Sequence, residues 1–140
     1  MGIETAYIAG LFDGEGSVIL ARHRKGTKYL ALVVQIVNTN RDVLEEIKLT
    51  YGGAIYAGRG TNKPIYAWKA YTDAAEKFLT AIEPYVHVKH RQVEIGLEFR
   101  RLIRLKGSQK RMTNEHVASR EALKAELTVL NFYRGRKREL

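Results

Sequence analysis

The segment Tyr7–Gly16, YIAGLFDGEG, constrains the fold of this chain more than any other part of the sequence. It predicts a short helix of apolar and small residues that ends in two carboxylates, Asp13 and Glu15. Gly10 inside a helix costs about 1 kcal/mol relative to alanine, and acids at the C-terminal end of a helix meet the negative pole of its dipole. Such departures from local preference are typical of functional sites.

Two gains could offset these costs. A divalent cation would make the carboxylates favourable, and a second helix packed closely at Ala6 and Gly10 would explain the glycine, because these residues lie one turn apart on the same face. The alternative is that Asp13–Gly16 forms an ordinary turn after a helix. It is not an EF-hand loop, because the later ligands and the terminal glutamate are missing.

The run from Ile8 to Gly16 resembles the nonapeptide that names the LAGLIDADG homing endonucleases, with Ile8, Phe12, Gly14 and Glu15 as ordinary variants. In that family the motif helix forms the core of a twofold interface, and its penultimate acid binds the catalytic magnesium. The resemblance therefore implies a dimer interface at Ala6, Ala9, Gly10 and Asp13.

Composition limits the possible functions. The chain has 140 residues, a formal net charge of +9 and no cysteine. We expect one domain over 1–140, a reducing compartment, and a polyanionic partner, nucleic acid first. The sequence shows no export signal and no run long enough to span a bilayer, so we expect a soluble, intracellular protein without a membrane partner, in the cytoplasm, nucleoid or an organelle matrix. The basic tail 134–140 is predicted to be flexible.

The acidic residues are unevenly distributed. Residues 16–41 and 54–72 hold 45 of the 140 residues and eight lysines and arginines, but none of the 15 acids. Low strand propensity of Asp and Glu explains part of this depletion, but not the acid-free turns. The distribution favours a surface that follows phosphates.

Hydrophobic periodicity and turn residues predict an α+β fold with the order αββαββα. We expect two further helices, at 88–105 and from Thr113 or Asn114 to about Asn131. The other expected elements are a helix at 3–12, strands at 17–24 and 28–38, a helix from an Asn40 cap to about Leu49, strands at 54–59 and 65–71, and a helix at 74–82 capped by Asp73.

This order is that of the LAGLIDADG fold, which implies an antiparallel saddle-shaped sheet in the DNA major groove with helices on its other face. Gln35 and Arg59 are the best candidate base readers, because amides pair with adenine and guanidinium with guanine. Ile19, Ala21, Ala31 and Val33 also face outward and give weight to thymine methyl contacts or DNA bending. The full set of predicted DNA-binding residues is Ser17, Arg22, His23, Arg24, Lys25, Lys28, Tyr29, Gln35, Arg59, Lys63 and Lys69.

The resemblance also implies a catalytic site. Glu15 and the backbone carbonyl of Gly14 would bind Mg²⁺ or another divalent cation such as Mn²⁺, with Asp13 supporting them. Lys89 would stabilise charge or help activate water, and Asn38 would orient that water. The function this implies is a homodimeric, site-specific endonuclease for double-stranded DNA. An RNA-binding intron maturase and a non-catalytic DNA-binding regulator remain as alternatives on the same fold.

Overall fold

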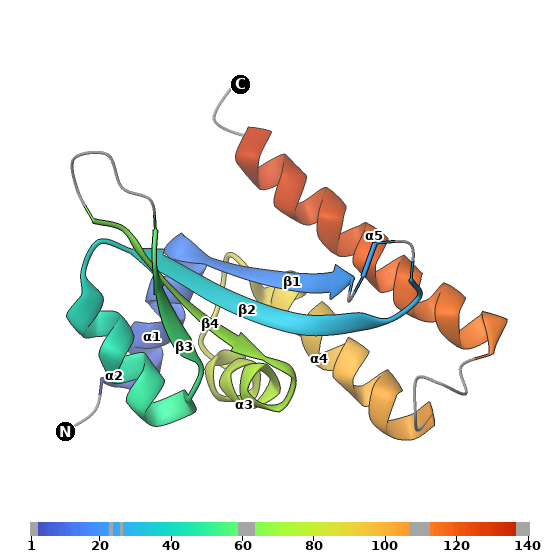
Figure 1. Cartoon of the computed structure of the whole chain (residues 1–140), viewed down its shortest axis with the longest axis horizontal. Coiled ribbons are helices and arrows are strands. Elements are labelled where there is room, and N and C mark those ends of the chain that lie inside the picture. Colours follow the sequence, from blue (N-terminus) through green and yellow to red (C-terminus); the bar gives the residue numbers. More distant parts are fainter. Residues whose placement is uncertain (1–2, 23, 26, 59–63, 107–112, 137–140) are drawn as a thin grey trace.

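The computed structural model describes residues 3–22, 24–25, 27–58, 64–106 and 113–136 (Figure 1). The predicted α+β class and element order are confirmed. The elements are α1 (Thr5–Glu15), β1 (Gly16–Arg22), β2 (Leu30–Asn38), α2 (Arg41–Tyr51), β3 (Ala54–Ala57), β4 (Tyr66–Tyr71), α3 (Thr72–Ile82), α4 (His90–Lys106) and α5 (Asn114–Arg136).

The four strands form one antiparallel sheet in the order β1-β2-β4-β3. Side chains alternate between the two faces of a strand, and one face is buried: Val18, Val34 and Trp68 are fully covered. The helices pack on this face, and α2, α3 and α4 lie below the strands in Figure 1. The core centres on Phe78, whose ring lies 5.5 Å from that of Phe12 and 4.8 Å from that of Trp68.

Helix α1 continues one turn further than predicted, because the backbone N–H of Gly16 donates to the carbonyl of Phe12 and keeps Asp13 to Glu15 helical. Asn40 caps α2 as predicted, accepting a hydrogen bond from the backbone N–H of Val43 at 3.2 Å.

The predicted cap of α3 is wrong. Asp73 lies in the first turn of the helix and pairs with Arg100 of α4, while Tyr71 occupies the cap position without a side-chain hydrogen bond. The Asp73 carboxylate, which the local sequence predicted to cap α3, is therefore engaged in an ion pair with Arg100 of another helix.

Helix α5 runs past its predicted end, so residues 134–136, expected in a flexible tail, are helical; 137–140 lie outside the described residues. The helix lies beside the edge strand β1 (Figure 1). Lys124 donates to the carbonyl of Leu20 at 2.8 Å, and Asn131 donates to that of Val18 at 3.2 Å. Occupying edge carbonyls in this way protects a sheet from pairing with another chain. None of the described helices could cross a membrane.

Candidate active site and nucleic-acid interface

The last turn of α1 presents the predicted metal ligands. Gly14 and Glu15 are both exposed, and a β-carbon added at Gly14 would meet no atom within 4 Å. The space beside the Cα of Gly14 is therefore open. A carboxylate at this pole of the helix is electrostatically unfavourable unless a cation joins it.

Asp13 has a clear role within the chain. Its carboxylate accepts hydrogen bonds from the backbone N–H groups of His87 at 2.8 Å and Lys89 at 3.0 Å, immediately before α4 begins at His90. Unpaired N–H groups at the start of a helix favour a negative partner. Asp13 thus stabilises the start of α4 from outside that helix, which places the carboxylate toward its own chain.

Lys89 is buried, with only 5% of its surface exposed. Its ammonium donates to the carbonyl of Phe12 at 3.0 Å and lies 5.7 Å from the centroid of the Phe12 ring. That carbonyl belongs to the last turn of α1, where a positive charge is favourable. The structure therefore brings Lys89 to the end of the helix that carries Glu15, although 74 residues separate the two in the sequence.

Asn38 ends β2 on the side of the sheet where α1 joins β1. Gly16 pairs with Ile36 in the β1–β2 register, so Asn38 lies two residues beyond that pair. Its Oδ1 accepts a hydrogen bond from the backbone N–H of Asn40 at 2.8 Å, which stabilises the turn into α2. The side chain thus has a structural function at the place where its predicted catalytic role would also be exercised.

Part of the predicted dimer interface is exposed. Ala6 and Gly10 lie on an open face of α1, and a β-carbon at Gly10 would meet no atom within 4 Å. Ala9 does not belong to this face. It is fully buried in the core of its own chain, because it lies one residue round the helix from Gly10, a rotation of about 100°. The prediction for Ala9 is therefore wrong.

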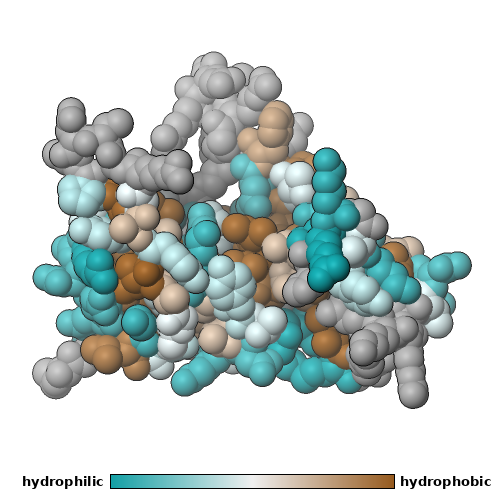
Figure 2. Space-filling view, viewed as in Figure 1, coloured by the Kyte–Doolittle hydropathy of each residue, from teal (hydrophilic) through white to brown (hydrophobic). Residues whose placement is uncertain are grey.

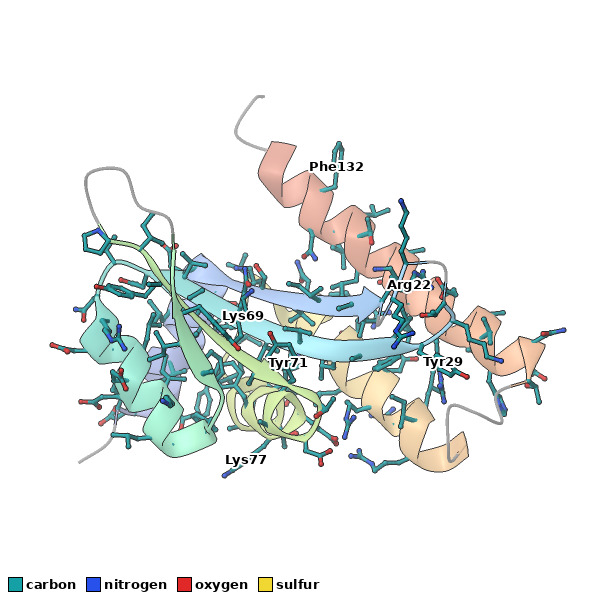
Figure 3. The ribbon with its side chains drawn as sticks, viewed as in Figure 1. Arg22, Tyr29, Lys69, Tyr71, Lys77 and Phe132 are labelled. Carbon is teal, nitrogen blue, oxygen red and sulfur yellow. The ribbon has the colours of Figure 1, made fainter. Side chains whose placement is uncertain are left out.

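The face of the sheet opposite the helices carries two parallel rows of side chains. Ser17, Gln35 and Lys69 are cross-strand partners in one row, and Ile19, Val33 and Tyr71 form the next. No acidic residue occurs in any of the four strands. Figure 2 shows brown, apolar side chains gathered in the middle of the view between teal groups, and Figure 3 labels Lys69 and Tyr71 there.

Arg22, predicted to contact DNA, is used elsewhere. Its guanidinium makes two hydrogen bonds to the Glu121 carboxylate of α5, at 2.8 and 2.9 Å, and another to the carbonyl of Thr27 at 2.6 Å (Figure 3). Arg22 has the same strand parity as Val18 and Leu20, so it leans toward the helices. The hydrogen bond to Arg22 lowers the pKa of Glu121. Sequence alone missed this pair because its partners are 99 residues apart.

The turn between β1 and β2 carries the exposed cations. Arg24, Lys25 and Lys28 are all exposed, and the Lys28 ammonium lies 5.9 Å from the centroid of the Tyr29 ring. The Thr27 N–H donates to the carbonyl of Arg24 at 3.0 Å, which closes the predicted turn. Three further predicted contacts lie outside the described residues: His23, Arg59 and Lys63.

Comparison with known proteins identifies the family. Residues 2–83 match the model of the LAGLIDADG-like domain, and the chain belongs to this family. It is 27% identical over 100 residues to the intron-encoded DNA endonuclease ai2b of Dictyostelium discoideum, covering 69% of this chain. The match spans 38% of that curated relative.

Solved structures show the same fold. The archaeal intron-encoded homing endonuclease I-Vdi141I, complexed with DNA, is 24% identical with a TM-score of 0.73, covering 90% of this chain and 82% of that one. The homing endonuclease I-CvuI, in complex with its target, is 15% identical with a TM-score of 0.71, and the match covers 90% of this chain and 80% of that one. The LAGLIDADG meganuclease I-AabMI, bound to uncleaved DNA, is 23% identical with a TM-score of 0.70, but the match covers 88% of this chain and only 44% of that one.

Proposed function

We propose that this chain is a single domain over 1–140 that forms half of a divalent-metal-dependent, homodimeric endonuclease, and that the dimer cuts double-stranded DNA at a long, near-palindromic site. The observation that carries this proposal is Glu15: an exposed carboxylate at the negative pole of α1, next to an exposed small-residue face and an acid-free sheet. A catalytic cation and a second copy of α1 account for both unfavourable features of the helix at once.

The donor set fits Mg²⁺ or Mn²⁺. The Glu15 carboxylate and the Gly14 carbonyl are hard oxygen ligands, and magnesium is commonly held by one or two carboxylates plus substrate phosphates. Among the described residues no group of three or more His, Asp or Glu side chains could hold a metal, so a second chain and the DNA would complete the site. The cation would polarise the scissile phosphate and lower the pKa of bound water.

Lys89 and Asn38 complete the proposed site. Lys89 would stabilise charge at the end of α1 and hold the last turn that presents Glu15. Asn38 would orient water through its amide while stabilising the turn into α2. The proposal for Lys89 is supported by its contact with the last turn of α1, and that for Asn38 by its place in β2, two residues beyond the partner of Gly16.

The dimer would place two sheets along the major groove. Packing through Ala6 and Gly10 relates two copies of α1 by a twofold axis, so the target should be nearly palindromic and about 20 bp long, roughly one groove turn for each sheet. The match to less than half of I-AabMI supports the view that one such unit is only part of a nuclease. Ser17, Gln35 and Lys69 would read bases, while Arg24, Lys25 and Lys28 would contact phosphates.

The test is selection from a randomised duplex library with Mg²⁺, followed by sequencing of the cut ends. We expect cleavage at one near-palindromic family of sites, abolished by EDTA and by Glu15→Gln. Glu4→Gln is the matched control, because it removes an exposed acid at the other end of the same helix. Duplex binding without cleavage by the parent protein would support the regulator instead, and binding of structured RNA alone would support the maturase.

A further inference from the structure

The apolar row on the open face of the sheet is unusual for a surface that would read hydrogen-bonding groups. Ile19, Val33 and Tyr71 lie side by side on β1, β2 and β4. Tyr71 is 46% exposed, whereas Val33 is only 7% exposed between its neighbours. Ile19 is partly exposed, so Ile19 and Tyr71 supply most of the exposed surface of this row, and Val33 lies between them.

The surroundings of this row identify what it could bind. The adjacent pair Ala21 and Ala31 extends it toward the basic turn between β1 and β2, and the row of Ser17, Gln35 and Lys69 borders its other side. The four strands contain no acid. An apolar strip set between cations and polar groups complements a partner that is anionic overall and has apolar groups at fixed positions.

Duplex DNA has one such group in its major groove, the C5-methyl of thymine. We propose that Ile19 and Tyr71, supported by Val33, recognise thymine methyl groups at fixed positions of each half-site. This inference rests on the proposed function and specifies its substrate. It also explains how a face with few hydrogen-bonding side chains selects a sequence.

The strand register also predicts the spacing between the bases that neighbouring rows would contact. Residues on the same face of a strand recur every second position, so neighbouring rows lie about 7 Å apart. Base pairs are stacked about 3.4 Å apart. If the strands follow the groove, the thymines read by the Ile19 row lie about two base pairs from the bases read by Gln35.

Deoxyuridine provides the test, because it differs from thymine only by the missing methyl group. Each thymine of the selected target is replaced singly by deoxyuridine, and the Kd of the full-length protein is measured with Ca²⁺ in place of Mg²⁺. Loss of one buried methyl should weaken binding roughly fourfold. We expect this loss at one or two thymines in each half-site, about two base pairs from the position whose preference is relaxed by Gln35→Ala.

Protein variants tie the effect to the row. Ile19→Ser removes the apolar branches of the side chain and leaves only a hydroxyl, so the difference between thymine and deoxyuridine should disappear at its position. Ile19→Val should retain the difference, and Leu49→Ser, at an 86% exposed site on α2, should leave it unchanged. Thermal unfolding confirms that each variant is folded.

The failures of the two proposals are distinguishable. Cleavage at a defined site with no deoxyuridine effect at any thymine would overturn the methyl inference and leave the endonuclease intact. An effect that persists in Ile19→Ser would also overturn it, because the methyl would then be read elsewhere. Selection of no duplex at all would overturn both.

Discussion

Asp13 and Lys89 connect the end of α1 to the start of α4 by two reciprocal hydrogen bonds. The Asp13 carboxylate accepts the backbone N–H of Lys89 at 3.0 Å, and the Lys89 ammonium donates to the carbonyl of Phe12, the residue before Asp13, also at 3.0 Å. Each residue thus satisfies backbone groups at the terminus of the other's helix. Because Glu15 follows in the same turn, this connection determines where the proposed metal ligand lies.

Replacing Asp13 with alanine should destabilise the fold. The N–H groups of His87 and Lys89 lose their acceptor, and loss of a helix-capping side chain costs about 0.5–2 kcal/mol. Urea denaturation measures the change. Glu15→Gln should be as stable as the parent protein or slightly more stable, since Glu15 is exposed and its charge lies at the negative pole of α1. An Asp13→Ala protein as stable as the parent would contradict the assigned role.

Lys89→Met tests whether the ammonium contributes more than packing. Methionine retains most of the buried volume, and the Phe12 carbonyl keeps its hydrogen bond from Gly16, so stability should change by no more than about 1 kcal/mol. Under the proposed function, cleavage should fall about 100-fold, as when a stabilising donor is removed, with DNA affinity unchanged. Single-turnover cleavage and filter binding separate the two. An equal loss in both would assign Lys89 to binding.

Gly10→Leu should prevent assembly without harming the chain. A β-carbon at Gly10 would meet no atom within 4 Å outside the backbone of its own helix, and a leucine is better than glycine in a helix by roughly 1 kcal/mol. If two copies of α1 pack here, sedimentation should show a dimer for the parent and a monomer for the variant. Ala122→Leu, at an exposed position of α5, is the matched control. An unchanged dimer would move the interface away from this face.

Gly16→Ala should be destabilising despite its small size. The added β-carbon would lie 2.2 Å from Cδ1 of Phe12, whose ring is fully buried against Phe78. Forcing a packed core apart costs about 1–3 kcal/mol. Gly14→Ala, two residues earlier, meets no atom within 4 Å, and its stability should equal or exceed that of the parent. The denaturant midpoint should therefore fall for Gly16→Ala and stay the same or rise for Gly14→Ala.

The ion pair between Arg22 and Glu121 should make stability depend on pH. The pKa of Glu121 is lowered from 4.5 by its hydrogen bond to Arg22. A lowered folded-state pKa means that the contribution is complete above about pH 4.5 and is lost as the pH falls through the folded value. Tm of the parent should exceed that of Glu121→Gln at pH 6, and the difference should shrink as the pH falls below 4.5. A difference that is constant over this range would show that the pair is not linked to protonation.

Sequence was most informative where the signal is local. Because Ile19 and Ala21 were expected to face outward, the alternation in β1 leaves Val18 and Leu20 for the core, where both are buried, and Asn40 is the cap that its position predicted. Prediction from the sequence failed where a residue distant in the chain binds the side chain in question. Asp73 pairs with Arg100 instead of capping α3, and Arg22, assigned from the sequence to DNA contact, pairs with Glu121.

The sequence by itself determined the order of elements, the acid-free sheet and the family motif, because periodicity, turn chemistry and charge are properties of neighbouring residues. Only the tertiary structure decided which residues surround Glu15. Lys89 and Asp13 meet because α4 begins beside the end of α1, and Ala9 is buried because its side of α1 turns toward the core. Contacts of this kind depend on how rigid elements pack, and no local pattern encodes that packing.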